Sequence, residues 1–203
     1  MMARAVTGQR SFIEQARREQ IVGAAIDVLY ESGFAAASLG AIAERIGVSK
    51  GVISYHFTGK TELLHEVIAH VLAEANEYMT PRITAAGSSL EALRIYVTSN
   101  LEYIGAHRPK IIAFTEILNG MPPAGAEPAP YDEGRAQAVA GLRHLLEAGQ
   151  AAGEFGGFSA YVVSVSLRAS IDVLSTLLRA DPELDTGAYG AELLRLYEKA
   201  VRA

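Results

Sequence analysis

The stretch GVSKGVISYHFTGK, residues 47 to 60, decides how this chain is interpreted. It interleaves serine, lysine, tyrosine and histidine with three apolar residues, Val48, Ile53 and Phe57. Such a mixture suits neither a hydrophobic core nor an ordinary solvated surface. It therefore indicates a short element whose apolar side packs inside the fold and whose polar side chains on the opposite side can contact a partner.

Helical spacing divides these side chains between two faces. At about 100° per residue, Ile53 and Phe57 fall on one edge of a helix that begins near Ser49. Lys50, Val52 and His56 fall on its flanks. The outward set is Gly51, Ser54, Tyr55 and Thr58. We expect the apolar edge to pack inside the fold and the polar face to stay available.

Two further helices precede this one. Ile21, Ala25 and Leu29 recur at helical spacing, and Gly33 is placed to end that helix with a positive φ. Ser38 can cap a short second helix, which Gly47 terminates. A supporting helix followed by helix, glycine turn and helix is the helix-turn-helix arrangement. Its last helix offers hydrogen-bonding groups and an N-terminal partial positive charge to a DNA major groove.

Residues 17 to 65 resemble the DNA-binding domain of the TetR family of bacterial transcriptional repressors. The resemblance is carried by ESGF at the end of the first helix and by SLGAIAERIGVSKGVISYHFTGKTELL after it. It implies that Lys60 and Ser38 contact phosphates, while Lys50 lies near bases. The predicted DNA-binding set is Ser38, Ser49, Lys50, Gly51, Val52, Ser54, Tyr55, His56 and Lys60.

Some roles stay open at this point. His56 either contacts a phosphate or packs half-buried on its neighbours, and Tyr55 either contacts the backbone or covers the first helix. Many family members carry an aromatic side chain where this chain has Ser54, so its contact is unassigned. Four arginines could form a minor-groove arm, although a flexible tail over residues 1 to 10 is the preferred interpretation for the first two. They are Arg4, Arg10, Arg17 and Arg18.

Composition agrees with this division of roles. The chain has 203 residues, half of them hydrophobic, and no cysteine, which excludes disulfides and thiolate metal sites and fits a cytoplasmic protein. Its net charge is −5. Residues 1 to 60 nevertheless hold seven Lys/Arg against five Asp/Glu, whereas the remainder holds eleven against eighteen. Only the N-terminal segment is therefore expected to meet an anion.

We expect an all-α fold of about nine helices, with a DNA-binding domain over 1 to 60 and a helical ligand-binding and dimerisation domain over 61 to 203. A helix from Lys60 is expected to stop before Pro81. Residues 119 to 132 contain four prolines and read as an exposed loop. The later helices are expected over residues 89 to 106, 109 to 119, 133 to 150, 160 to 178 and 187 to 200.

The family resemblance also implies a homodimer on a palindromic operator and a small-molecule effector. The apolar stripes of the last two helices are wider than one core needs, and the resemblance implies that these helices form the dimer interface; the alternative is the core of a monomer. Its predicted residues are Val163, Leu167, Ile171, Leu174, Leu178, Leu193, Leu196 and Tyr197. The resemblance implies a pocket for this effector, of unidentified specificity, among helices four to eight, and bulky or polar residues within apolar stretches are its candidate lining. These are Tyr96, Asn100, Tyr103, Phe114, Ile117, Leu118, His144 and Ser170.

Enzymatic interpretations find little support. GVSKG matches the G-x-S-x-G spacing but follows a helical pattern rather than a strand. The histidines of HEVIAH are five apart and so lie off a common helix face, and we expect no metal site. No phosphate-loop or dinucleotide motif occurs, so no cofactor is expected. Two alternatives remain: a DNA-binding regulator controlled by a protein partner or abundance, and a small helical enzyme using His65, His107 or Glu116.

A membrane span is not expected. The most apolar stretch, residues 161 to 178, carries Arg168 and Asp172 near its middle. Charged side chains at that depth are costly in hydrocarbon.

Overall fold

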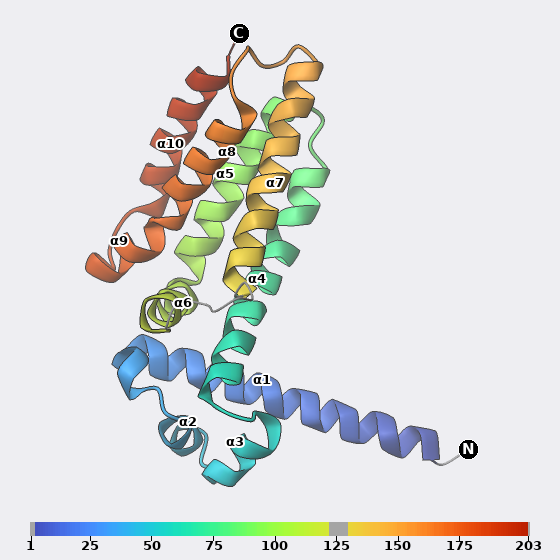
Figure 1. The fold of residues 1–203 in the computed structure, drawn as a ribbon, viewed down its shortest axis with the longest axis vertical. Coiled ribbons are helices and arrows are strands. Elements are labelled where there is room, and N and C mark those ends of the chain that lie inside the picture. The colour runs from blue at the N-terminus through green and yellow to red at the C-terminus, as the bar shows by residue number, and fades with distance from the viewer. Residues whose placement is uncertain (1–2, 122–129, 203) are drawn as a thin grey trace. The chain divides into compact units, whose positions relative to one another are not determined.

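The computed structural model describes residues 3 to 121 and 130 to 202, with side chains described from residue 12 onward except at residue 130. These residues form ten helices and no strand, so the all-α prediction is confirmed (Figure 1). The helices are α1 (Ala3–Ala36), α2 (Leu39–Arg45), α3 (Lys50–His56), α4 (Lys60–Thr84), α5 (Ser89–Ala106), α6 (Arg108–Gly120), α7 (Pro130–Ala151), α8 (Ala160–Asp172), α9 (Leu174–Ala180) and α10 (Thr186–Val201).

The described helix count exceeds the expected nine because one predicted helix is two. The segment predicted as a single helix over 160 to 178 is interrupted at Val173, which separates α8 from α9. Residues 122 to 129, most of the predicted loop, lie outside the described residues.

The chain forms two compact units. Unit 1 comprises residues 1 to 68 with 113 to 122, and unit 2 comprises residues 69 to 112 with 123 to 203. The helices α4 and α6 therefore each contribute residues to both units.

Unit 1 is organised by two glycine breaks. Gly33 has φ +76° and Gly47 has φ +66°, conformations that other residues rarely adopt. The predicted break at Gly33 is therefore confirmed, and its ψ of 175° turns the chain sharply out of the helix. Packing of α1 on α2, and of α2 on α3, then builds the predicted helix-turn-helix.

Two helix limits differ from expectation. The backbone of α1 is helical from Ala3, over the region of Arg4 and Arg10 for which a flexible tail was expected. The side chains of both arginines lie outside the described set. Likewise α4 continues through Pro81 to Thr84. A proline removes only its own N–H, and Pro81 is exposed near the helix end, where solvent can hydrate the freed carbonyl.

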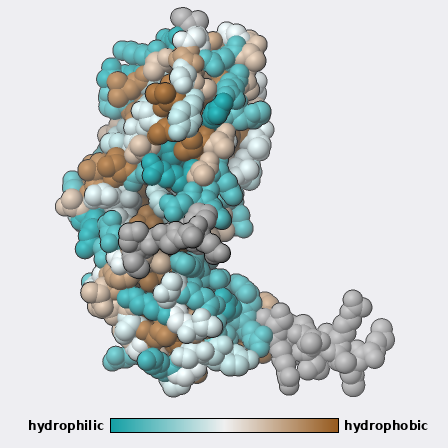
Figure 2. All heavy atoms as spheres, viewed as in Figure 1, coloured by the Kyte–Doolittle hydropathy of each residue, from teal (hydrophilic) through white to brown (hydrophobic). Residues whose placement is uncertain are grey.

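Unit 2 is a bundle in which α5 packs against both α10 and α7, and α7 packs against α8. Its core contains fully buried leucines such as Leu93, Leu142 and Leu167. The Glu154 carboxylate accepts hydrogen bonds from the Ser89 and Leu90 N–H groups at the start of α5, at 3.1 and 3.0 Å. Figure 2 shows apolar side chains reaching the surface in several places among polar ones on the helices of this unit.

The segment Ala160–Ala180 is long and apolar enough, by length and composition alone, to cross a membrane. In the structure it contributes Leu167, Ile171 and Leu174 to the core of unit 2 with no exposed surface. Its Arg168 and Asp172 form an ion pair at 2.8 Å. The segment forms α8 and α9 and packs one face into the core of unit 2, and 28% of its most apolar window is buried.

Candidate nucleic-acid interface

The third helix, α3, has the two faces predicted for it. Ile53 and Phe57 are 0% and 1% exposed, so the apolar edge is fully packed. Gly51, Ser54 and Tyr55 are exposed, Tyr55 at 75%. An aromatic side chain left so open at the surface is unusual and is available to a partner.

Arg18 of α1 fixes the far end of α3. Its guanidinium lies 4.3 Å from the centre of the Phe57 ring and donates a hydrogen bond of 2.6 Å to the His56 carbonyl. It also pairs with Glu66 of α4 at 3.1 Å. Arg18 therefore joins three helices, and it satisfies a carbonyl left free at a helix C-terminus. Sequence reasoning considered Arg18 only for a minor-groove arm, because contacts this far apart leave no local pattern.

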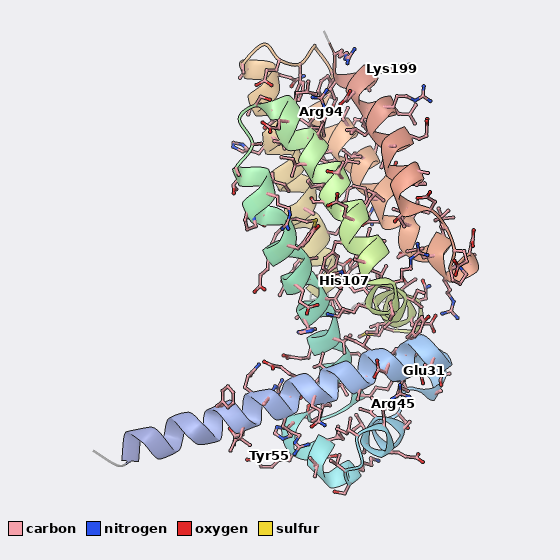
Figure 3. The ribbon with its side chains drawn as sticks, turned by 180° about the vertical axis from the view of Figure 1, so that it is seen from behind. Glu31, Arg45, Tyr55, Arg94, His107 and Lys199 are labelled. Atoms are coloured by element: carbon pink, nitrogen blue, oxygen red, sulfur yellow. The ribbon has the colours of Figure 1, made fainter. Side chains whose placement is uncertain are left out.

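A bidentate ion pair joins the second helix, α2, to the first, α1. Arg45 donates to Glu31 at 2.7 and 2.5 Å (Figure 3), and Asp27 lies 3.6 Å away. The Arg45 hydrogen bond lowers the pKa of Glu31. At the other end of α2, the Ser38 hydroxyl accepts a hydrogen bond of 3.1 Å from the Ala41 N–H. The predicted Ser38 cap is confirmed, and its own hydroxyl proton remains available for a phosphate.

Phe34 forms a junction between three helices inside unit 1. Its N–H donates to the Glu116 carboxylate at 2.9 Å, and its carbonyl accepts from Lys60 Nζ at 2.8 Å. The Lys60 ammonium also lies 4.1 Å from the centre of the Phe34 ring. A Cβ on Gly120 would meet that ring at 2.1 Å, so only glycine fits there. The end of α1 is thereby fixed to α4 and to the end of α6.

This junction changes the interpretation of Lys60. The sequence predicted a phosphate contact, but its ammonium is directed to the Phe34 carbonyl and ring. Burial lowers the pKa of Lys60. Its geometry supports a positioning role at the start of α4.

Gly51 has no structural reason to be glycine. A Cβ at this exposed position would meet only the Ser49 hydroxyl oxygen, at an ordinary 3.5 Å. Glycine inside a helix costs roughly 0.5 to 1 kcal/mol relative to alanine. The open space above Gly51 therefore favours close approach by something outside the fold.

The other predicted DNA-binding residues lie around this opening. Lys50 is exposed and has no ion pair with any residue that the structure describes. Ser49 occupies the N-cap position but makes no capping hydrogen bond with its side chain. Val52 and His56 are half-buried, and the His56 ring packs edge-on against Tyr55 with centroids 5.0 Å apart. The Tyr55 hydroxyl lies 3.4 Å from the Glu14 carboxylate of α1. Tyr55 can therefore either cover the first helix or, since it is exposed, contact the DNA backbone.

Unit 2 contains a cavity of about 220 Å³ between α4, α5, α7 and α8. Of the eight residues predicted for an effector pocket, Tyr96 and Asn100 line it. Arg168 also lines it and was missed as a ligand-binding residue. The signal was present, because a charged residue interrupts the most apolar stretch of the chain.

The remaining predicted pocket residues lie elsewhere. Tyr103 is buried, stacks on His107 at 4.2 Å and directs its hydroxyl to Glu74. His144 is exposed, and the Ser170 hydroxyl donates to the Ser166 carbonyl of its own helix. Three residues belong to the part of α6 that forms unit 1: Phe114, Ile117 and Leu118. Choosing bulky or polar residues within apolar stretches therefore does not distinguish residues that line the cavity from residues of the core or the surface.

Most residues predicted for the dimer interface are interior to one protomer. The stripe that periodicity identified packs inside unit 2, because the widest apolar face of a helix turns first to its own core. The fully or nearly buried members are Leu167, Ile171, Leu174, Leu178 and Leu193. Val163 is half-buried, and Tyr197 is half-buried with its hydroxyl 2.8 Å from that of Ser166. Leu196 is 58% exposed.

A different apolar strip is open on the same helices. It consists of exposed side chains of α8, its junction with α9, and α9 itself. They are Tyr161, Val162, Val173 and Leu177. Among the described residues there is no group of three or more His, Asp or Glu side chains that could hold a metal ion.

Comparison with known proteins agrees with this geometry. Residues 21 to 67 match the family described as bacterial regulatory proteins, tetR family. The regulator BetI of Vibrio parahaemolyticus, described as an HTH-type transcriptional regulator, is 29% identical over 99 residues, covering 49% of this chain and 50% of that protein. BetI of Klebsiella pneumoniae is 32% identical over 88 residues, covering 42% of this chain and 45% of its own length. The chain thus matches about half the length of these relatives.

Solved structures extend the likeness to nearly the whole fold. A tetR-family regulatory protein from Rhodococcus RHA1 superimposes with a TM-score of 0.76 at 18% identity, covering 92% of this chain and 97% of that one. The regulator AibR, solved with isovaleryl coenzyme A and operator DNA, gives 0.75 at 16% identity, with 89% and 97% covered.

A helix-turn-helix with an exposed polar recognition helix, carried by an all-helical chain of two units, defines a DNA-binding regulatory protein. The matched residues 21 to 67 contain α2 and α3 entirely. The match to the tetR family of bacterial regulatory proteins thus covers the helix-turn-helix segment, and the solved structures extend the likeness in fold beyond it.

Proposed function

We propose that this protein is a cytoplasmic repressor that binds a palindromic operator as a homodimer and is released by a small-molecule effector. The observation that carries the proposal is the surface of α3: open space above Gly51, with Lys50, Ser54 and Tyr55 exposed around it. The buried Ile53 and Phe57 hold that surface rigidly against the rest of unit 1. Rigid presentation of a polar helix face is what major-groove recognition needs.

Within this surface the residues have separate roles. Lys50, at the start of α3, is placed for a base edge, while Tyr55 near the helix end is placed for a phosphate. Ser38 at the start of α2 adds a second phosphate contact through its free hydroxyl proton. Lys60 acts indirectly, by holding the end of α1 through Phe34.

The homodimer is supported by the exposed apolar strip of α8 and α9. Val162 and Val173 share a helix face with Ser166 and Ala169, whose small exposed side chains permit close approach of a second helix. A two-fold pair of recognition helices doubles the contacts on a palindrome. A single helix-turn-helix reads too few base pairs for comparable specificity.

Selection of bound duplexes from a random pool tests the DNA-binding proposal. We expect a palindromic consensus and an affinity that falls steeply with salt, since each neutralised phosphate adds a slope of about 0.9 in log affinity against log salt. Lys50→Ala is expected to change the preferred sequence, whereas Tyr55→Ala lowers affinity for all sequences and flattens the salt dependence. Equal losses on every operator for Lys50→Ala would contradict its base-reading role.

A second candidate is a DNA-binding regulator that responds to a protein partner or to its own abundance. It shares the α3 surface and differs only in the use of the cavity lined by Tyr96, Asn100 and Arg168. Effector coupling of the usual size weakens DNA binding by about 5 to 150-fold. A metabolite panel in which no compound changes either the melting temperature or operator affinity would favour this second candidate.

A helical enzyme built on His65, His107 or Glu116 is not favoured. Glu116 accepts the Phe34 N–H inside unit 1, and His107 is stacked on Tyr103 in unit 2. His65 is half-buried on α4. Glu116 and His107 thus have hydrogen-bonding or packing roles within their own units.

A further inference from the structure

The cavity in unit 2 is lined by Tyr96, Asn100 and Arg168, by apolar side chains of α4 and α7, and by three polar side chains of α4, those of Asn76, Thr80 and Thr84. We propose that it takes a small, neutral, mostly apolar molecule whose carbonyl oxygen accepts hydrogen bonds from Tyr96 and Asn100. This inference rests on the proposed function, because it names the chemical class of the effector.

Arg168 fixes the polar end of the cavity. Its side chain is only 13% exposed, and its Nε and Nη2 both lie 2.8 Å from Asp172 Oδ1. Its Nη1 donates to the Asn100 amide oxygen at 3.1 Å and to the Tyr96 hydroxyl at 3.3 Å. One buried guanidinium therefore orients both side chains that face the cavity.

The orientation of Asn100 follows from its neighbours. Its amide oxygen accepts from Arg168, and its amide nitrogen donates to the Tyr96 carbonyl at 2.7 Å. The opposite orientation would set two donors against each other and two acceptors against each other, so the network permits only this one.

Two donors are then left over. The second amide N–H of Asn100 has no acceptor among the described residues. The Tyr96 hydroxyl oxygen accepts from Arg168, so its own proton is free to point into the cavity. Asn100 and Tyr96 are only 4% and 8% exposed, and buried donors without acceptors are costly. A ligand oxygen between them removes that cost, and the Arg168 hydrogen bonds strengthen both donors.

The hydrogen bonds of Arg168 favour a neutral ligand. All three nitrogens of its guanidinium already donate, to Asp172, Asn100 or Tyr96. A carboxylate ligand would lose its hydration beside an arginine whose nitrogens already donate elsewhere. A carbonyl oxygen loses much less hydration and uses the same two donors.

The rest of the cavity sets the size and polarity of the ligand. Its apolar surface comes from Met79 and Ile83 of α4 and from Leu142 and Leu145 of α7. Asn76, Thr80 and Thr84 of α4 also line it. Its volume of about 220 Å³ is below the range of roughly 300 to 1,000 Å³ for drug-sized ligands. The ligand is therefore a compact molecule, on the scale of a substituted ring or a short chain.

Matched fragments test this chemistry on the full-length protein. Calorimetry and ligand-observed NMR would compare the ketones acetophenone and 2-heptanone with ethylbenzene, which has no acceptor, and with benzoate and hexanoate, which are anions. We expect the ketones to bind at least fivefold more tightly than both other classes, as one or two hydrogen bonds imply. Equal binding of ethylbenzene, tighter binding of the carboxylates, or no ketone binding would each overturn the proposal.

Variants locate the binding. Tyr96→Phe keeps the ring and removes the donor, so ketone affinity should fall about five- to tenfold while ethylbenzene affinity stays unchanged. Tyr78→Phe is the matched control, because its hydroxyl bonds Glu102 and does not line the cavity. An unchanged ketone affinity in Tyr96→Phe, with a native circular dichroism spectrum, would contradict the assignment.

Operator binding measured on the same samples separates the two proposals. Loss of ketone binding with intact salt-sensitive DNA binding removes only the inference about the effector. Absence of DNA binding, with the ketones still bound, removes the proposed function and leaves the cavity chemistry standing.

Discussion

The two units of this chain use buried and exposed residues in opposite ways. In unit 1 the buried residues of α3, Ile53 and Phe57, serve only to hold an exposed polar surface in place. In unit 2 the candidate chemistry is itself buried, with Arg168, Tyr96 and Asn100 joined in one network beside a cavity. In unit 1, substitution of an exposed site residue should therefore leave the unfolding free energy nearly unchanged. In unit 2, substitution of a site residue should lower the unfolding free energy as well as ligand affinity.

The largest expected effect tests the first of these expectations, in unit 1. Phe57→Ala removes a ring that is 1% exposed and lies under the Arg18 guanidinium, so we expect a loss of about 4 kcal/mol in unfolding free energy. Tyr55→Ala, on the exposed face, should change stability by less than about 0.5 kcal/mol. Both should lose operator affinity. Urea denaturation followed by circular dichroism distinguishes them, and a large stability loss in Tyr55→Ala would break the comparison.

The next largest effect tests whether stability and ligand binding are lost together in unit 2. Arg168→Met leaves Asp172 in place without its closest partner, and we expect about 3 kcal/mol of destabilisation, at the low end for a broken buried pair because Arg135 remains 3.5 Å away. The same variant should abolish ketone binding. Adding Asp172→Leu should recover most of the stability without recovering the binding, since the orienting hydrogen bonds stay lost. Full recovery of binding would show that Arg168 serves only the fold.

The two units also differ in how far the sequence predicted them. The inward and outward sides of α3 followed from helical spacing alone, since a shift of one residue, about 100° around the helix, decides whether Ile53 or Ser54 meets the core. The same reasoning assigned Leu167 and Ile171 of α8 to an interface although both are fully buried in unit 2, because such residues fit a core and an interface equally well. The lining of the cavity was mostly missed for another reason. It depends on which helices converge, and only Tyr96 and Asn100 of the predicted set lie at that convergence.

Polar contacts between residues far apart in the sequence could not be predicted from the sequence either. Lys60 has the position of a phosphate contact in the motif, yet its ammonium is directed to Phe34, 26 residues earlier in the chain. Glu116, considered as a possible catalytic group, accepts the Phe34 N–H instead. Neither contact has a local pattern, because the partners come from three different helices.

A smaller effect concerns the pH dependence of stability and is expected at Glu74 in unit 2. Burial acts to raise the pKa of Glu74, but the hydrogen bond and charge of Lys110, with His70 and Tyr103, lower it overall. A carboxyl group with a lowered folded pKa stabilises the protein above its unfolded pKa, and this contribution is lost as pH falls through the folded value. The Glu74 side chain is 34% exposed, so we expect less than about 1 kcal/mol. Stability curves of wild type and Glu74→Gln should converge below the folded pKa of Glu74; parallel curves would contradict this role.

A small gain in stability gives the sharpest test, because its sign is opposite to that of the expected effect on DNA binding. Gly51→Ala adds a methyl group where only the Ser49 hydroxyl oxygen is near, at 3.5 Å, so folding should become more favourable by about 0.5 to 1 kcal/mol. Gly149→Ala in unit 2 is the counterpart, because its Cβ would meet the buried Phe155 ring at 2.2 Å and should cost roughly 1 to 3 kcal/mol.

The operator affinity of Gly51→Ala then tests whether DNA approaches the backbone of α3 at Gly51. If a duplex approaches the backbone of α3 there, the more stable Gly51→Ala protein binds its operator more weakly than wild type in an electrophoretic or anisotropy titration. The less stable Gly149→Ala protein retains affinity under conditions in which it is folded. A Gly51→Ala protein that is both more stable and equally tight on DNA would show that the open space above α3 is not where the duplex lies, and the recognition surface would have to be moved along the helix toward Tyr55.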